Sequence, residues 1–343
     1  MHDKINSAKS SDLGTCSPIF IVGCPRSGTH LLRNMLRSHP NLSFTGESHF
    51  IPKFYKAFGD PKSQKEAERL ASRILNLQWI QPWNLSLDPA SFAHDRSYTQ
   101  VVRRIFEAWV QKENKSRWGD KTPQYVTEMP VLLELFPDCK FIHIIRDGRD
   151  VALSWLALSF GPRNIFTAAR QWQYFVSTGQ RVGRSLPAET YFEIRYEKLL
   201  AQPGAVMDSI CSFINEPFCQ ELLEPNPLVL DYPERKSIFG RFTPSYNYAL
   251  KNTIVDKNAS KWKRQMSCSD QVIFETIAGN LLKSLGYETT AKTRSISKLE
   301  QIFWQANHTF FWWLSSFNSK NRMKWMKTDW LLRWADYVAR SQK

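Results

Sequence analysis

The sequence predicts an α/β protein whose mostly parallel sheet is covered by helices on both faces. Three runs rich in β-branched and aromatic residues indicate strands: "PIFIVG" (18–23), "CKFIHII" (139–145) and "ETYFEIRYEKLL" (189–200). Each is followed by a helical pattern: "HLLRNMLRSHP" (30–40), the segment after "RDGRD" (146–150), and "AVMDSICSFI" (205–214). Strands that alternate with helices in this way form parallel sheets.

The two loops that follow the first two of these strands indicate where a ligand binds. "GCPRSGT" and "RDGRD" both come directly after a predicted strand. Ligands of open parallel sheets bind beyond the carboxyl ends of the strands. A further short strand is predicted in "NLSFTGE" (41–47), which ends in polar residues. These loops are therefore expected to lie on one rim of the sheet.

The chain divides into a main domain and three additions. Residues 1–17 are expected to be a flexible tail, and residues 18–288 the main domain. Residues 60–117 carry helical patterns interrupted by Pro and Asn, which indicates a helical insertion. Residues 289–343 are expected to form a helical appendage, because tryptophans and basic residues gather there.

The formal charge is +14, from 46 basic and 32 acidic residues, which favours an anionic partner. Nucleic acid, a membrane surface and a phosphorylated small molecule all fit this charge. The basic residues are dispersed and no nucleic-acid motif is present, so we expect no nucleic-acid partner. The six cysteines form no CxxC pair and are expected to be reduced and mostly buried, without a metal. The N-terminus has no signal-peptide core and no run of about 20 apolar residues occurs, which favours a cytoplasmic protein.

The loop in "IFIVGCPRSGTHLLRNML" (19–36) resembles a phosphate-binding loop that lacks its lysine. Gly23 and Gly28 have the spacing of G-x-x-x-x-G-K-[ST], but Thr29 and His30 occupy the last two positions. Neither the lysine nor the hydroxyl that follows it and holds magnesium is present. The loop still places backbone N–H groups and a helix N-terminus around an anion.

Side chains of the same loop complete an anion site. Arg26 supplies a cation, and Ser27 and Thr29 supply hydroxyl donors. The pattern predicts a phosphate or sulfate site without a metal.

Several ordered motifs carry a family resemblance. They are "PRSGTHLL", "GESHFIP", "WGDKTP", "FIHIIRDGRDVALSW", "RYEKLL", "ASKW" and "LGY", between residues 18 and 288. They resemble sulfotransferases that use 3′-phosphoadenosine 5′-phosphosulfate (PAPS), most closely the tyrosylprotein and bacterial-type branch. The resemblance implies a P-loop-like fold and sulfuryl transfer without a metal.

Sulfuryl transfer needs cations near the leaving oxygen and a base for the acceptor proton. By their match to the family, Arg26 and Lys121 are the predicted catalytic cations. Glu47 is the predicted general base, with His49 as its rival because cytosolic sulfotransferases use a histidine.

The donor nucleotide is expected to contact a larger set of residues. The 5′-phosphosulfate is assigned to the loop residues Arg26, Ser27, Gly28, Thr29 and His30. Arg146 and Ser154 resemble the pair that binds the 3′-phosphate; alternatively, Arg146 only forms a salt bridge with a neighbouring aspartate. Tyr196 and Lys251 are further candidates. Leu158 stands where the tyrosylprotein branch carries another basic residue.

The acceptor is predicted to be a hydroxyl, less readily an amine, of a small molecule, carbohydrate or lipid. Trp79, Trp83 and Trp109 of the insertion are expected to line its binding site. The alternatives are a P-loop kinase or NTPase, and a protein-tyrosine sulfotransferase. Residues 301–334 mix aromatic and basic side chains, which fits either a peripheral membrane contact or a helical hairpin packed on the main domain.

Overall fold

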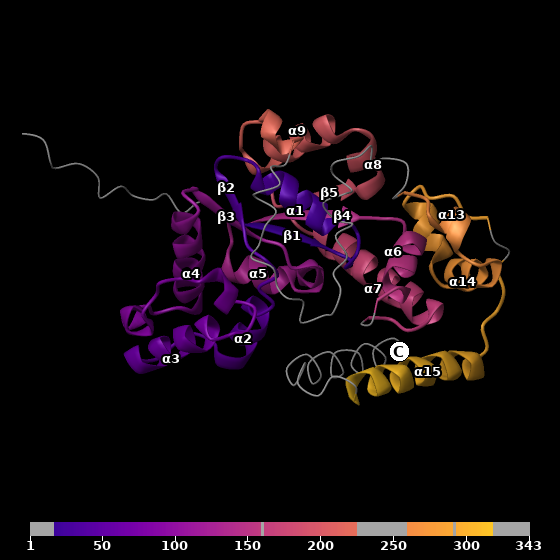
Figure 1. Cartoon of the computed structure of the whole chain (residues 1–343), viewed down its shortest axis with the longest axis horizontal. Coiled ribbons are helices and arrows are strands. Elements are labelled where there is room, and N and C mark those ends of the chain that lie inside the picture. The colour runs from indigo at the N-terminus through magenta and orange to yellow at the C-terminus, as the bar shows by residue number, and fades with distance from the viewer. Residues whose placement is uncertain (1–16, 159–160, 225–258, 291–292, 318–343) are drawn as a thin grey trace, which may run out of the picture. The chain divides into compact units, whose positions relative to one another are not determined.

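The computed structural model describes residues 17–158, 161–224, 259–290 and 293–317, and its centre is a five-stranded sheet (Figure 1). The strands are β1 (Ile19–Gly23), β2 (Leu42–Phe44), β3 (Arg117–Asp120), β4 (Lys140–Ile145) and β5 (Tyr191–Arg195). Their order is β2-β3-β1-β4-β5, and every neighbouring pair is parallel. The predicted class of fold is confirmed.

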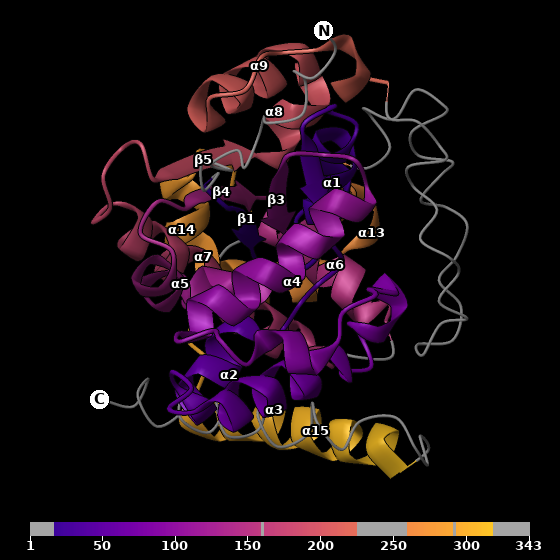
Figure 2. The ribbon, with the colours of Figure 1, turned by 90° about the vertical axis from the view of Figure 1, so that its left-hand side faces the viewer.

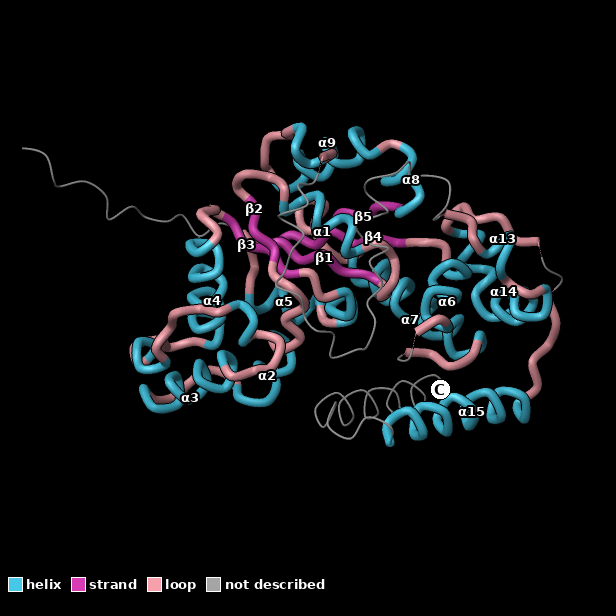
Figure 3. The backbone as a smooth tube through the Cα atoms, viewed as in Figure 1, coloured by secondary structure: helices cyan, strands magenta, loops and turns pink. Residues whose placement is uncertain are grey.

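The central strand β1 is completely buried, as expected of a strand with neighbours on both sides and helices on both faces (Figure 3). The ring of Phe20 packs against Trp118 on β3 and Phe141 on β4, with ring centroids 5.8 and 5.7 Å apart. Burying such aromatic side chains typically contributes about 2 kcal/mol each. These ring contacts connect β1 with both of the strands that pair with it.

The described residues form two compact units. The first comprises residues 17–146 and 174–224 and contains the sheet. Its helices are α1 (Thr29–Arg37), α2 (Ile51–Phe58), α3 (Gln64–Leu75), α4 (Tyr98–Lys112), α5 (Met129–Leu135), α8 (Tyr196–Ala201) and α9 (Pro203–Ile214). Short 3₁₀ turns lie at Gln81–Trp83, Pro89–Phe92, Pro123–Thr127 and Gln220–Leu222.

Helices α3 and α4 lie within residues 60–117, the range of the predicted helical insertion, and α2 directly precedes it; all three face the viewer in Figure 2. Ser97 and Gln100 form a reciprocal capping box at the start of α4. Ser63 caps α3 by accepting a hydrogen bond from the Glu66 amide. These polar residues explain where the helices begin.

The second unit comprises the described parts of residues 147–173 and 257–317. It contains α6 (Gly148–Leu156), α13 (Trp262–Gln265), α14 (Cys268–Ser284) and α15 (Lys298–Phe317), while α7 (Ile165–Gly183) begins here and ends in the first unit. Arg149 is buried in this unit and forms ion pairs of 2.7 Å with Asp147 and with Glu275. Its guanidinium lies over the Trp262 ring, 3.4 Å from the centroid.

Two sequence expectations were wrong in detail. The strand predicted over 189–200 covers only Tyr191–Arg195, and α8 begins at Tyr196, because "YEKLLA" has a helical rather than an alternating pattern. Strand β3 was not predicted at all. Among the described helices, none is long and apolar enough to cross a membrane.

Candidate active site

The loop between β1 and α1 has the geometry of an anion site. Arg26 and Gly28 have positive φ angles of 76° and 93°, so the backbone turns sharply twice before α1 begins. A side chain at Gly28 would collide with the Tyr196 ring, since a Cβ there would lie 2.2 Å from it. No side chain caps the N-terminus of α1, and no acidic residue lies in its first turn. The positive end of this helix is therefore open to an anionic ligand.

Ser27 lies inside this loop and Thr29 is the first residue of α1, and both are buried. The Ser27 hydroxyl finds no hydrogen-bond partner among the described residues. A buried hydroxyl without a partner costs about 1–3 kcal/mol, which an anion at this position would recover. The loop thus fits the phosphate or sulfate predicted from its sequence.

Arg146 follows β4 and lies against the loop. Its Nη1 donates to the backbone oxygen of Arg26 at 3.3 Å, and its guanidinium lies over the Tyr196 ring at 4.6 Å. The ends of β1, β4 and β5 therefore bring together Arg26, Arg146 and Tyr196. Asp147, one of the two aspartates that could instead pair with Arg146, forms an ion pair with Arg149.

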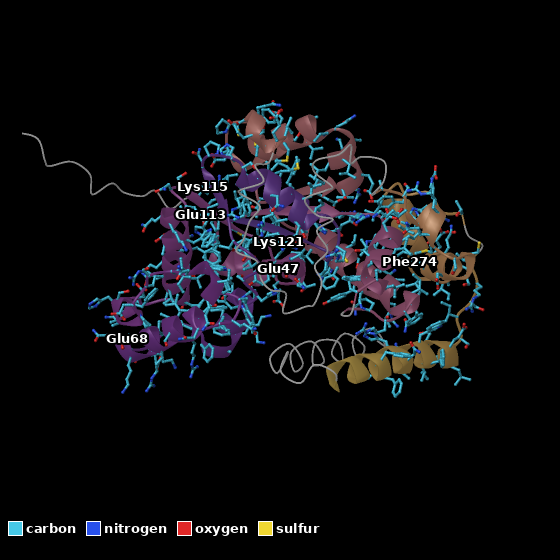
Figure 4. The ribbon with its side chains drawn as sticks, viewed as in Figure 1. Glu47, Glu68, Glu113, Lys115, Lys121 and Phe274 are labelled. Carbon is cyan, nitrogen blue, oxygen red and sulfur yellow. The ribbon has the colours of Figure 1, made fainter. Side chains whose placement is uncertain are left out.

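Lys121 and Glu47 form the second part of the site, immediately after β3 and three residues after β2 (Figure 4). The Lys121 Nζ donates to Glu47 Oε1 at 2.6 Å and to His30 Nε2 at 3.1 Å. The His49 Nε2 lies 3.0 Å from Glu47 Oε2. Lys121 is only 1% exposed, whereas 28% of the Glu47 side chain is accessible. Glu47 is thus partly exposed, while its lysine partner is covered.

Electrostatics keep Glu47 ionised. Burial opposes its charge, but Lys121 and then His49 outweigh this effect and hold the pKa of Glu47 well below its ordinary value. Burial, aided by the Lys121 charge, lowers the pKa of His30 well below its ordinary value. Since an ammonium has no lone pair, the neutral His30 ring accepts the hydrogen bond from Lys121.

A buried polar network behind Lys121 was not anticipated from the sequence. The Ser48 amide donates to Thr122 Oγ1 at 3.0 Å, and the hydroxyls of Ser48 and Tyr125 are 2.8 Å apart. Burial raises the pKa of the adjacent Asp120 to about 6, although the hydroxyls of Thr122 and Ser48 act in the opposite direction. The run of polar residues in "GDKTP" was the available signal.

Arg33 on α1 was also missed. It is buried, and its charge lowers the pKa values of both His30 and Lys121. Arg33 lies three residues after His30, a spacing that places two side chains on one helical face. It increases the positive potential where an anion would bind.

The remaining predicted residues are Ser154, Lys251 and the three tryptophans of the insertion. Ser154 lies half-buried on α6, in the second unit, and Lys251 lies outside the described residues. Trp83 and Trp109 are buried in the core beside Phe106, which corrects the expectation that they line an acceptor site. Only Trp79 lies near the cluster, with its ring centroid 6.0 Å from that of His49.

Comparisons with known proteins support this reading of the fold. The family model described as "Sulfotransferase family" matches residues 18–220. A protein-tyrosine sulfotransferase A of Caenorhabditis elegans is 27% identical, over 87% of this chain and 75% of its own length. A protein-tyrosine sulfotransferase of Drosophila melanogaster is 25% identical over 90% of this chain, which spans 57% of that relative.

A solved structure extends the likeness to three dimensions. The sulfotransferase domain of the Synechococcus PCC 7002 olefin synthase superposes with a TM-score of 0.56. It is 22% identical, and the match covers 83% of this chain and all of that domain. Since the family model spans more than half of the chain, this protein belongs to the sulfotransferase family.

Proposed function

We propose that this enzyme transfers a sulfuryl group from PAPS to an acceptor hydroxyl, with Glu47 as the general base. The observation that carries this proposal is the cluster of Lys121, Glu47 and His30 at the carboxyl ends of neighbouring strands. An anion-binding loop opens α1, the helix that carries His30. A base, a buried cation and an anion site are the three parts that sulfuryl transfer requires.

When bound, PAPS supplies the sulfuryl group and an anionic leaving group. The loop amides, Ser27 and Arg26 are proposed to hold the 5′-phosphosulfate, and Arg146 the 3′-phosphate. Tyr196 keeps Arg146 in place through the contact between its ring and the guanidinium. Ser154 and Lys251 remain proposed nucleotide contacts on the family resemblance alone.

Lys121 has a double role in this proposal. Its ammonium has three donors, and two of them contact Glu47 and His30 among the described residues. The third can stabilise negative charge that develops on a leaving oxygen. In the same step Glu47 takes the proton of the acceptor hydroxyl. A shift of Lys121 toward the leaving oxygen makes Glu47 a stronger base, because the ammonium then stabilises the carboxylate less.

The acceptor is proposed to be a hydroxyl of a small molecule, carbohydrate or lipid. Trp79 beside His49 offers an aromatic surface next to the base. The named relatives favour the second candidate, a tyrosine side chain of a protein. Labelled PAPS offered with phenols, sugars, long-chain alcohols and a tyrosine peptide separates these classes.

Calorimetry tests the donor site. We expect 3′-phosphoadenosine 5′-phosphate (PAP) to bind in excess EDTA and ATP to bind much more weakly. Arg146→Ala should weaken PAP binding roughly 10- to 100-fold, because it removes charge-assisted hydrogen bonds. Arg103→Ala is the matched control, since this arginine pairs with Asp138 on the protein surface. ATP binding that requires magnesium, or no loss in Arg146→Ala, would contradict the proposal and favour a kinase or NTPase.

A further inference from the structure

Helix α15 presents two different faces, and one of them is anchored within the second unit. The Asn164 side-chain amide donates to the backbone oxygen of Trp304 at 2.8 Å. The Arg163 amide donates to His308 Nδ1 at 3.2 Å, and His308 is buried. Trp304 and His308 are one turn apart, so they mark the inward face of the helix.

The opposite face is apolar and exposed. Leu299, Ile302, Phe303 and Phe310 are 79%, 60%, 60% and 55% exposed. At 3.6 residues per turn they fall, with Ala306, on a stripe about 100° wide, opposite Trp304 and His308, whereas Phe311, which is 49% exposed, falls beside Trp304. Large exposed apolar side chains in one continuous stripe mark an interaction surface rather than ordinary protein surface.

The charge pattern identifies the partner. The sequence has no Asp, Glu, Lys or Arg from residue 301 to 319, and Lys320, Arg322, Lys324 and Lys327 then follow before the next acidic residue. Burial, aided by Arg163, lowers the pKa of His308 to about 4, so it adds no charge at neutral pH. An apolar helical face followed by a cluster of cations is complementary to an anionic bilayer, which offers an apolar layer beneath negative headgroups.

We propose that α15 is a membrane-docking helix that lies in the headgroup region of an anionic bilayer, with Leu299, Ile302, Phe303 and Phe310 inserted. No described helix is long and apolar enough to cross a membrane, so the mode is interfacial. The basic run after α15 attracts the negative surface. This inference is independent of the donor chemistry, because α15 contributes no residue to the candidate active site.

Co-sedimentation of the full chain with vesicles tests the proposal. One set is pure phosphatidylcholine, and the other contains phosphatidylglycerol as well. We expect strong binding to the anionic set only. The combined variant Ile302→Ser, Phe303→Ser and Phe310→Ser should bind at least about tenfold more weakly, since it removes most of the inserted apolar surface. Phe218→Ser, at an exposed apolar residue outside α15, is the matched control and should bind like the wild type.

A second variant separates the electrostatic contribution. Lys320→Gln, Arg322→Gln, Lys324→Gln and Lys327→Gln together should lower the partition coefficient about 100-fold or more, because each cation near an anionic surface contributes several-fold. Far-UV circular dichroism spectra and unfolding transitions like those of the wild type confirm that both variants are folded.

Three outcomes would overturn the proposal. The first is no wild-type binding to anionic vesicles, and the second is undiminished binding by the serine variant. The third combines two results: neither the wild type nor the serine variant binds vesicles, and light scattering without lipid shows a dimeric wild type and a monomeric serine variant. That last result would make a second copy of the chain the occupant of this face.

Discussion

Lys115 and Lys121 flank the same four-residue strand, β3 (Figure 4). Their ammonium groups nevertheless contact different kinds of partner, backbone oxygens in one case and side chains in the other. Lys115, at the amino end, donates to the backbone oxygens of Arg37, His39 and Leu42. Lys121, at the carboxyl end, donates to the titratable side chains Glu47 and His30. The first lysine ties the end of α1 to β2, and the second takes part in the proposed chemistry. In this sheet the same residue type is structural at one end of β3 and is proposed to be catalytic at the other, where ligands of parallel sheets bind.

The pKa shifts of the two lysines have similar causes, but their carboxylate partners lie differently. Burial lowers the pKa of Lys115 to about 8, with Glu113 acting in the opposite direction. Burial also lowers the pKa of Lys121, and Glu47 acts against it. Only at Lys121 is the carboxylate partner in direct contact and partly exposed. That accessible carboxylate makes the carboxyl end a candidate for catalysis.

The largest expected effect is at the proposed base. Glu47→Gln should lower kcat about 10²- to 10⁴-fold, because it removes the proton acceptor and keeps the shape. His49→Gln should have a smaller effect. Since the pKa of Glu47 is held low, wild-type activity should stay level as the pH falls to about 5. An acid limb near the usual histidine pKa of about 6.5, lost in His49→Gln, would assign the base to His49 instead.

Asp120, at the carboxyl end of β3, should make the free energy of unfolding depend on pH. Its folded pKa of about 6 lies above its unfolded value, so the folded state binds more protons between about pH 4 and 6. Stability should therefore fall by up to about 3 kcal/mol as the pH rises through that range. Urea unfolding of the wild type and of Asp120→Asn measures this, and the same slope in both proteins would refute the assignment.

At the amino end, Lys115→Met should lower the free energy of unfolding by about 2 kcal/mol, because it leaves backbone oxygens without donors. The kcat should change little. Lys65→Met, at an exposed lysine of α3, is the control and should lie within about 0.5 kcal/mol of the wild type. Chemical denaturation of the wild type and the two variants measures these free energies. Equal stability of all three proteins would mean that Lys115 is not structural.

The smallest effect concerns the orientation of Lys121. His30→Ala should lower kcat about tenfold, because it removes one hydrogen-bond acceptor from the ammonium. His30→Gln retains an acceptor and should restore much of the rate. Equal kcat values for the alanine and glutamine variants would show that His30 does not orient Lys121.

The sequence predicted the fold well where the signal was local. The apolar runs of β1 and β4 and the glycines after β1 lie within a few residues, so strand, loop and helix could be recognised together. Strand β3 was missed because "RWGD" is short and largely polar, and it is a strand only through its pairing with β1 and β2.

The candidate site was predicted as separate residues, not as an arrangement. Glu47 and Lys121 came from ordered motifs, while their 2.6 Å contact joins positions 74 apart. The contact of His30 with Lys121 joins positions 91 apart, so its role could not be predicted from local pattern. Trp83 and Trp109 were misjudged because composition alone does not distinguish a core tryptophan from one in a binding site.

The most direct test of the contrast between the two ends of β3 is sulfuryl transfer from labelled PAPS by Lys121→Met and Lys115→Met, at a temperature where both are folded. We expect Lys121→Met to be about 10³-fold slower than the wild type, because it loses the cation at the leaving oxygen. Lys115→Met should transfer at close to the wild-type rate. Near-normal transfer by Lys121→Met, or loss of transfer in folded Lys115→Met, would contradict this division of roles.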